Sequence, residues 1–338
     1  MAENTHRHTQ RVARLQSQGS PPEFAIEATD IPSLGPHEVL VELEVTGICG
    51  TDLALASGHL GPCNPILGHE GVGQIVAVGP MCSSRTAVLG QRVGVGWIRD
   101  ACGSCRVCKS GAGQTRCMTQ VFSGRDVPGT MAQFTVVPER YITTLPDDVA
   151  SELLAPIMCA GVTAYKAIKV AQAVPGSWLL ISGAGGSVGG LALQYAKAMG
   201  YRAVAVDVGE ERRKTCVDAG AEVYLDYEKE GDLRAATISE TDGHLCSAAI
   251  VCAGSARAYE AALSCLDYYG TLVAVGIPPP TSKPTFHPLT LIDYGIKIVG
   301  SITGDREDIS EASQFLRRGL VKPKVVSIDL KDVEAYLS

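Results

Sequence analysis

The sequence predicts an α/β protein of two domains, a β-rich one followed by a doubly wound parallel sheet. Three observations lead to this prediction. At 338 residues, the chain is longer than one ordinary hydrophobic core requires. Residues 36–137 form short alternating apolar segments separated by glycine and proline, which is typical of a barrel-like β domain. After about Gly161, apolar strands alternate with helices, as in a parallel sheet covered by helices.

The expected elements can be placed in chain order. A first strand is predicted over 11–15, and alternating apolar and polar residues predict half-buried strands over 39–45 and 73–79. The run 178–182 is apolar throughout, as in a buried strand, and 188–199 is an apolar helix that ends before a glycine. The later elements are a strand over 202–207, a helix over 210–219, and strands over 248–252, 271–276 and 296–300.

Composition and charge exclude several classes of partner. The chain is 46% hydrophobic and 19% charged, as in soluble globular proteins. A net charge of −7 without a basic cluster argues against nucleic acid and anionic membranes. The longest uncharged run, 170–196, is interrupted by Pro175, Gly176 and a cluster of glycines, so we expect no membrane span.

Four cysteines lie close together in the sequence. Cys102, Cys105, Cys108 and Cys117 follow one another at intervals of three, three and nine, and the residues between them include glycine, serine, arginine and lysine. Thiols at this spacing do not fit one regular strand or helix, but they can surround a tetrahedral ion. We expect a closed structural zinc site. Thiols at metal spacing behind the polar, signal-free start 1–10 also predict a reducing compartment, the cytoplasm.

A second group of possible metal ligands is dispersed. Cys49 lies in Ile-Cys-Gly-Thr-Asp, His69 in Leu-Gly-His-Glu-Gly, and Cys159 in Ile-Met-Cys-Ala-Gly. Two thiolates and an imidazole would leave one coordination position of a zinc ion free for chemistry. Nothing local in the sequence forces these residues together, so spacing alone does not settle this group.

A glycine-rich turn follows the first strand of the parallel sheet. Gly183, Gly185, Gly186 and Gly189 stand between an apolar strand and an apolar helix. Such a turn lets the backbone and the positive helix end approach a pyrophosphate. Asp207 ends the next strand, where a carboxylate accepts from the ribose hydroxyls and repels a 2′-phosphate. This predicts NAD rather than NADP.

A basic stretch follows Asp207 and bears on the same choice. Arg212, Arg213 and Lys214 could serve a 2′-phosphate, which would favour NADP. A solvated helix face explains them more simply, so NAD remains the prediction. We keep Arg212 as a candidate cofactor-binding residue.

Together the motifs resemble the zinc-dependent alcohol dehydrogenases of the medium-chain dehydrogenase/reductase superfamily. Gly68-His-Glu-Gly-Val-Gly73 is similar to the family's zinc signature, and the segments 49–52 and 158–166 are similar to those that carry its first and third zinc ligands. The stretch 181–207 is similar to the yeast-type tetrameric enzymes, and the resemblance covers residues 11–325.

The resemblance implies a domain division and an activity. Residues 1–160 would form a GroES-like catalytic domain with a structural zinc lobe near 100–120, 161–303 a Rossmann NAD-binding domain, and 304–338 a return to the first domain. Such an enzyme transfers a hydride between a primary alcohol or aldehyde and NAD. It would hold two zinc ions per subunit and assemble as a homotetramer or homodimer.

The resemblance also implies roles for single residues. Those at the catalytic zinc would be Cys49, His69 and Cys159 as ligands, Glu70 as a residue just outside the ligands or a transient ligand, Asp52 as the acceptor that orients His69, and Thr51 in the proton relay. Those at the nicotinamide would be the side chains of Thr163 and Val188 and the backbone near Val275 and Ser301.

Three departures from the family pattern matter. Ala54 stands where many relatives carry the histidine that ends the proton relay, with His59 as a candidate substitute. Leu60 stands where yeast-type enzymes narrow the pocket with a tryptophan, while Trp97 keeps the other side aromatic, so we expect room for a bulky or aromatic primary alcohol. Finally, the sequence stops at Ser338, where the family continues into a further strand. We expect either that the sequence is truncated or that this strand is absent.

Two alternatives stay open at this point. One is a zinc-free quinone or enone reductase on the same fold, which would not need Cys49, His69 and Cys159. The other is a non-enzymatic relative that binds a nucleotide and has kept the structural zinc lobe alone.

Overall fold

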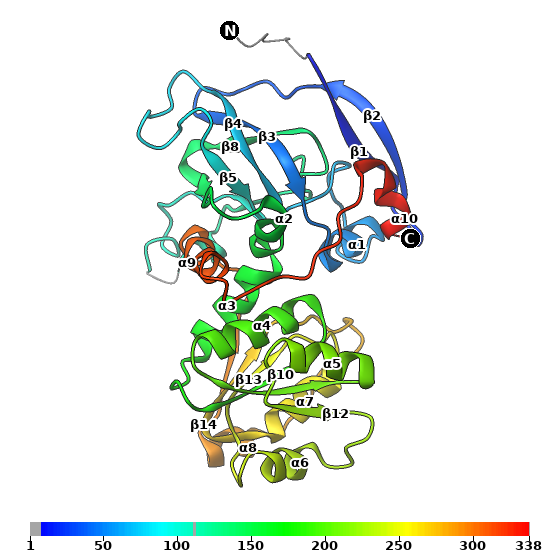
Figure 1. Ribbon diagram of the computed structural model, residues 1–338, viewed down its shortest axis with the longest axis vertical. Coiled ribbons are helices and arrows are strands. Elements are labelled where there is room, and N and C mark those ends of the chain that lie inside the picture. The colour runs from blue at the N-terminus through cyan, green and yellow to red at the C-terminus, as the bar shows by residue number, and fades with distance from the viewer. Residues whose placement is uncertain (1–7, 111–112, 338) are drawn as a thin grey trace. The chain divides into compact units, whose positions relative to one another are not determined.

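The computed structural model describes residues 8–110 and 113–337, so most of the polar start lies outside the described residues. The chain divides into two units (Figure 1). The first consists of Met1–Cys159, Asp305–Arg317 and Pro323–Ser338, and the second of Ala160–Gly304 and Arg318–Lys322. The segment expected to return to the first domain is therefore interrupted. Val321 is buried in the second unit, and the Lys322 amide donates to Gln194 Oε1 at 2.7 Å.

Antiparallel strands build the first unit. The main sheet has the order β8-β3-β4-β5-β9 and is accompanied by the pairs β1-β2 and β6-β7. In β3, Val39 and Val41 are fully buried on one face, while Glu42 on the opposite face is exposed. This is the predicted alternation. The strands are β1 (Thr9–Ser17), β2 (Glu23–Asp30), β3 (Glu38–Thr46), β4 (Gly71–Val78), β5 (Arg92–Val95), β6 (Ile98–Asp100), β7 (Val121–Phe122), β8 (Phe134–Pro138) and β9 (Thr143–Thr144).

Short helices fill the connections of the first unit. The C-terminal helix α10 packs on β2, and the Phe24 amide donates to Glu334 Oε2 at 3.3 Å. The helices are α1 (Gly50–Ala56), α2 (Ser151–Leu154), α9 (Arg306–Arg317) and α10 (Val333–Leu337), with 3₁₀ turns η1 (Gln114–Arg116), η2 (Glu139–Tyr141), η3 (Ala155–Met158) and η4 (Leu330–Asp332).

A parallel sheet forms the second unit. Its order is β12-β11-β10-β13-β14-β15, with β10 and β13 in the middle, so the chain runs outward from the centre in both directions. The strands are β10 (Trp178–Ser182), β11 (Arg202–Asp207), β12 (Val223–Asp226), β13 (Cys246–Val251), β14 (Leu266–Ala274) and β15 (Lys297–Gly300). The helices are α3 (Ala160–Ala171), α4 (Ser187–Ala198), α5 (Glu210–Asp218), α6 (Leu233–Glu240), α7 (Ala256–Ser264) and α8 (Pro288–Tyr294).

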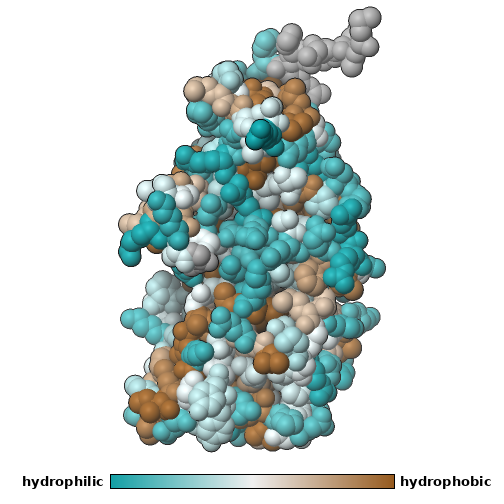
Figure 2. Space-filling view, turned by 90° about the vertical axis from the view of Figure 1, so that its left-hand side faces the viewer, coloured by the Kyte–Doolittle hydropathy of each residue, from teal (hydrophilic) through white to brown (hydrophobic). Residues whose placement is uncertain are grey.

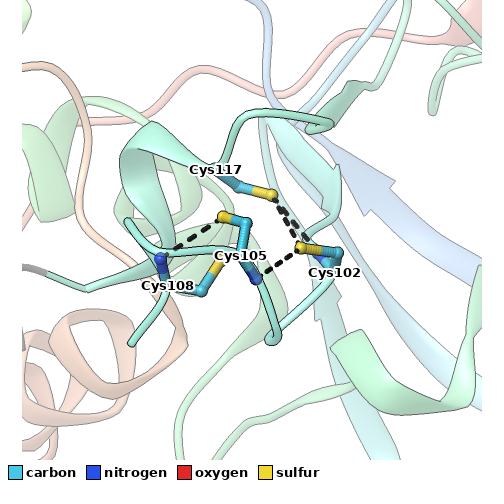
Figure 3. A group of neighbouring side chains, drawn as sticks. All are labelled: Cys102, Cys105, Cys108 and Cys117. Carbon is cyan, nitrogen blue, oxygen red and sulfur yellow. Dashed lines mark hydrogen bonds between the residues drawn. The ribbon is translucent and has the colours of Figure 1, made fainter. Parts of the chain in front are cut away.

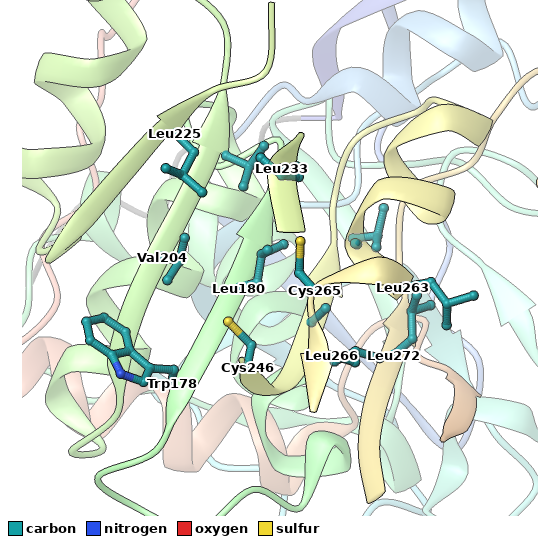
Figure 4. Packing of buried hydrophobic residues seen from close by; sticks show 14 of the residues in the cluster. Trp178, Leu180, Val204, Leu225, Leu233, Cys246, Leu263, Cys265, Leu266 and Leu272 are labelled. Carbon is teal, nitrogen blue, oxygen red and sulfur yellow. The ribbon is translucent and has the colours of Figure 1, made fainter. Parts of the chain in front are cut away.

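Both faces of this sheet are covered. On one face Leu180 and Val204 pack with Leu233 of α6 and Leu263 of α7 (Figure 4). Leu179 and its neighbours alternate to the other face, where α3 and α4 contact each other. The predicted fold, a β-rich domain joined to a doubly wound parallel sheet, is confirmed. No single helix in the described ranges has the length and apolar character of a membrane span; a bent pair, Ser151–Met158 with Ala160–Ala171, does so by length and composition only.

Candidate metal centre and cofactor site

Cys49 is held by the start of helix α1. It is the N-cap residue, and its Sγ accepts from the Thr51 amide at 3.3 Å. The Cys49 amide in turn donates to Asp52 Oδ2 at 3.0 Å, which completes a capping box. The contacts that begin the helix therefore also fix the position of the Cys49 sulfur.

Asp52 links Cys49 to His69. Its other oxygen, Oδ1, accepts from His69 Nδ1 at 3.0 Å and from the Gly68 amide at 3.2 Å. Because a carboxylate only accepts, Nδ1 carries a proton, and Nε2, which faces Cys49 Sγ at 3.3 Å, is the nitrogen that can bind a metal. Gly68 has φ +95°, and a Cβ there would lie 2.6 Å from Thr130 Oγ1, so the approach to His69 requires glycine.

Cys159 and Glu70 complete this group. Cys159 follows the turn η3, and its Sγ lies 4.0 Å from Cys49 Sγ. Glu70 is 3% exposed, and its Oε1 is buried with no hydrogen-bond partner among the described residues. The possible ligand atoms of Cys49, His69, Glu70 and Cys159 all lie within 4.8 Å of one another.

The charges of the group are strongly coupled. The hydrogen bond from Cys159 lowers the pKa of Cys49, with help from the charge on His69, and raises the pKa of Cys159. Burial alone would lower the pKa of His69, but the charges of Asp52 and Cys49 outweigh it and raise this pKa. Burial, reinforced by the charge on Cys49, raises the pKa of Glu70. A divalent cation would relieve this crowding, because it binds thiolate, imidazole and carboxylate together.

These residues fit a zinc ion. Tetrahedral coordination with Zn–S near 2.3 Å places its ligand atoms ~3.5–3.8 Å apart, close to the 3.3 Å and 4.0 Å that separate Cys49 Sγ from His69 Nε2 and Cys159 Sγ. Two thiols and an imidazole are ligands that zinc prefers, and Asp52 supplies the outer hydrogen bond usual for a zinc-bound histidine. The unpartnered Oε1 of Glu70 is a further oxygen that an ion would satisfy.

The four consecutive cysteines also converge, at a separate place in the first unit (Figure 3). Cys117 Sγ lies 3.5 Å from Cys102 Sγ. Backbone amides donate to the sulfurs: that of Cys105 to Cys102 at 3.3 Å and that of Cys108 to Cys105 at 3.5 Å. These amides stabilise thiolates, and four thiolates without a free position suit a structural zinc ion.

The glycine turn of the second unit has the expected form. Gly183 has φ +73° and begins the turn after β10. A Cβ on Gly189 would lie 2.2 Å from the Gly183 carbonyl oxygen, so the turn packs tightly on α4. Asp207 ends β11, and its Oδ2 accepts from the Gly185 amide at 2.7 Å. Arg212 Nη1 donates to the Gly185 carbonyl, so this side chain lies on the turn. Gly186 is the N-cap of α4.

The remaining cofactor candidates lie in the same unit. Thr163 is buried in α3, and Val188 is in the first turn of α4. The amides of Val275 and Ser301 donate within the sheet, to Val251 and Ala274 at 3.2 and 2.9 Å. A nicotinamide contact would therefore use their carbonyl groups or Ser301 Oγ, which is buried and has no hydrogen-bond partner in the part of the chain that the structure describes.

The pocket candidates share one hydrophobic cluster. Leu60 and Trp97 are half-buried and pack against the cluster that contains Leu67 and Met131. Sequence reasoning missed two residues behind Trp97, namely Phe122, whose ring stacks on the indole, and the buried Arg99. A lone aromatic residue and a lone arginine in short strands carry no motif, so no signal in the sequence would have revealed them.

Comparison with known proteins agrees with this geometry. Residues 35–147 match the family model for the alcohol dehydrogenase GroES-like domain, and residues 187–318 match that for zinc-binding dehydrogenases. An alcohol dehydrogenase of Geobacillus stearothermophilus is 40% identical over 314 residues, which is 91% of this chain and 89% of that protein. One of Schizosaccharomyces pombe is 38% identical over 317 residues, 93% of this chain and 89% of that protein.

A solved structure agrees as well. Acetophenone reductase of Geotrichum candidum in complex with NAD has a TM-score of 0.85 and 28% identity, and covers 99% of this chain and 94% of its own. Nothing in these comparisons favours the zinc-free reductase or the non-enzymatic relative. The chain belongs to the zinc-dependent alcohol dehydrogenases of the medium-chain dehydrogenase/reductase superfamily.

Proposed function

We propose that the chain oxidises primary alcohols with NAD at a zinc ion held by Cys49, His69 and Cys159, while the four consecutive cysteines hold a second, structural zinc ion. The convergence of the dispersed ligands, with Glu70 Oε1 buried beside them, is the observation that carries the proposal. When bound, zinc supplies a Lewis acid that polarises the substrate C–O group, and NAD supplies the hydride acceptor.

The residues of the chain then orient the substrate and handle its proton. Asp52 keeps the proton of His69 on Nδ1, so Nε2 stays available to the metal. The Thr51 hydroxyl, two residues after a ligand, would accept the alcohol proton and at the same time pass its own proton on. Ala54 offers no further acceptor, so the proton passes to solvent or to exposed His59, whose Nδ1 is 2.7 Å from Ser57 Oγ. Glu70 lies just outside the three ligands and serves there or as a transient ligand.

NAD rather than NADP is the proposed cofactor, bound at Gly183, Gly185, Gly186 and Gly189. The Asp207 carboxylate at the end of β11 supports this choice, because it would repel a 2′-phosphate. Asp207→Asn should lower the ratio of kcat/KM for NAD to that for NADP by roughly tenfold to a hundredfold, the usual effect of hydrogen bonds to a charged group. Asp218→Asn, an exposed acid nearby, should leave the ratio unchanged.

The proposed substrate is a bulky or aromatic primary alcohol, or the matching aldehyde. Leu60 in place of a larger residue and the indole of Trp97 support this class. Steady-state kinetics on a panel of alcohols tests it directly. A clear preference for ethanol over benzyl alcohol would overturn the substrate assignment and leave the reaction type intact.

We also propose a homo-oligomer, a dimer or tetramer. The sheet of the second unit ends at β15, and the adjacent helix α8 has no buried residue. Tyr269 and Ile292 are 81% and 73% exposed, and on the one face that Figure 2 shows, hydrophobic groups are more frequent over the second unit than over the first. Such a surface suits a second copy of the chain. Ile292→Glu should lower the mass measured by light scattering, whereas Val174→Glu, equally exposed in a loop, should not.

The twelve cysteines are free thiols, which favours the cytoplasm as the compartment.

One experiment tests the core of the proposal. Zinc per chain is measured beside turnover of an alcohol panel with NAD and NADP. About two zinc ions per chain and NAD-dependent turnover that is lost in Cys49→Ala are expected. One zinc ion and no turnover with any alcohol would refute the proposal.

A further inference from the structure

The indole of Trp97 lies against the dispersed metal group. Its ring centroid is 5.3 Å from that of His69, and the two rings meet edge to face at 77°. Trp97 also packs, together with Leu60, against the cluster that contains Leu67 and Met131. A flat aromatic surface therefore stands beside the atoms that would meet a substrate.

Phe122 supports this indole. The two rings are stacked, with centroids 4.8 Å apart and an interplanar angle of 24°. Phe122 lies in β7, which pairs with Ile98 of β6, directly after Trp97. The guanidinium of Arg125 lies 5.9 Å from the Phe122 centroid. Because stacked rings restrict each other's orientation, the indole cannot tilt away from His69 without losing the stack.

Arg99 anchors β6, the strand that begins directly after Trp97. It is 5% exposed, and its hydrogen bonds reach only uncharged acceptors among the described residues: Ser123 Oγ at 3.1 Å, Thr135 Oγ1 at 3.0 Å, the Val136 carbonyl at 2.5 Å and the Pro128 carbonyl at 3.1 Å. Burial lowers the pKa of Arg99 to about 10, so it stays charged at neutral pH. Because a buried charge is costly unless its donors are satisfied, these four acceptors fix the position of the guanidinium, and the charge of Glu38 adds a weaker attraction.

Ser123 connects Arg99 to Trp97. Its hydroxyl accepts from Arg99 and donates to the Gly96 carbonyl at 2.7 Å. Its amide donates to the Trp97 carbonyl at 2.9 Å. Ser123 thus fixes the carbonyl groups before and after the Trp97 Cα, those of Gly96 and Trp97, while Phe122 fixes the indole ring.

We infer that Arg99 and Phe122 are positioning residues that hold the Trp97 indole as a fixed wall of the substrate pocket, and that this wall selects flat aromatic alcohols over small aliphatic ones. The inference rests on the proposed function, because it places the substrate beside His69. A wall that is rigid before binding loses little conformational entropy when a flat ring stacks on it. A small alcohol covers less of the wall and gains less from its position.

The test uses the two tryptophans of the chain. In a Trp178→Phe background, emission comes from Trp97 alone. Three quantities are measured on zinc-loaded protein: the fluorescence anisotropy decay of Trp97, the Kd of benzyl alcohol from quenching of its emission, and kcat/KM for benzyl alcohol and ethanol with NAD. The variants are Phe122→Ala, the milder Phe122→Leu, the conservative Phe122→Tyr and Arg99→Met, with exposed Arg85→Met as the control for loss of an arginine.

In Phe122→Ala, Phe122→Leu and Arg99→Met we expect fast indole motion, and roughly tenfold losses in affinity and kcat/KM for benzyl alcohol, mostly through KM, with ethanol changed less than threefold. Phe122→Tyr and Arg85→Met should behave as the parent. An indole that stays rigid, or equal losses for both alcohols, would overturn the inference. If the parent turned over no alcohol, the proposed function would fail, while anisotropy and benzyl alcohol binding would still decide on the wall.

Discussion

The two cysteine groups use the same side chain in opposite surroundings. In the compact group, sulfurs accept hydrogen bonds from backbone amides, such as that of Cys105 to Cys102 Sγ at 3.3 Å, and the described residues add no carboxylate to the four possible ligands. In the dispersed group, Cys49 and His69 lie beside the buried acids Asp52 and Glu70. Backbone amides donate to three of the four sulfurs, those of Cys102, Cys105 and Cys117, and such a group needs only to hold an ion. Buried carboxyl groups beside a ligand set can orient a ligand, as Asp52 orients His69, and leave a polar group for chemistry.

The largest effect should come from breaking the compact group. Cys117→Ala removes a ligand that is 4% exposed, and loss of a structural metal destabilises by more than about 5 kcal/mol. The midpoint of thermal unfolding should fall by at least ~10 °C. Calorimetry checks this, with Cys82→Ala, which lies outside both groups, as the control. A variant that melts within 2 °C of the parent, as roughly expected for a neutral substitution, would contradict a structural role.

Breaking the dispersed group should abolish turnover with little loss of fold. Cys49→Ala should lower kcat/KM for an alcohol at least ~10³-fold, since a Lewis acid contributes several kcal/mol to the transition state. Zinc content should fall by one ion per chain. Cys63→Ala, a nearby thiol outside both groups, should keep both quantities. Residual turnover above a hundredth of the parent's would assign the chemistry elsewhere.

Lowering the pH should release the zinc ion from the dispersed group. The raised pKa values of Cys159 and His69 mean that both carry protons in the metal-free protein at neutral pH, and zinc must displace these protons. Affinity should therefore rise with pH by up to about a hundredfold per unit, and fall correspondingly as pH drops. Titration with a chelator of known affinity between pH 6 and 8, roughly the range in which the imidazole normally titrates, measures the slope. A flat profile would mean that the ligands are already deprotonated.

The smallest effect should come from the outer hydrogen bond. Asp52→Asn keeps the shape but replaces the carboxylate that accepts from His69 Nδ1. Zinc affinity or turnover should fall by roughly tenfold to a hundredfold, the usual effect of a residue behind a ligand. The compact group should keep its zinc, which a two-step chelator titration would show. Loss of both ions together would mean that Asp52 supports the fold rather than the site.

Local patterns predicted the fold well. The alternation over 39–45 and the apolar run 178–182 each became a strand, because period-two burial and continuous burial depend on neighbouring residues. The short strand β12 (Val223–Asp226) was not predicted, since four residues carry too little periodicity. The position of Arg318–Lys322 could not be predicted either, because it depends on the contact between Lys322 and Gln194, which are far apart in sequence.

The sites divide in the same way. The compact group followed from spacing, because its geometry is local. The dispersed group came from family resemblance, since Cys49 and Cys159 meet only after the barrel has closed around them. The roles of Arg99 and Phe122 could not be predicted. They lie in strands of three and two residues, and the burial of such short strands depends on packing with distant parts of the chain.

The separations of these sulfurs along the chain also bear on how the protein comes into being. Cys102 and Cys117 are 15 residues apart, and Cys49 and Cys159 are 110 apart. Closing the longer loop costs about 2 kcal/mol more in chain entropy. A growing polypeptide can thus capture its first ion soon after residue 117 leaves the ribosome, before any barrel exists. The second ion must wait for the folded barrel, so we expect metal loading during synthesis to follow a fixed order.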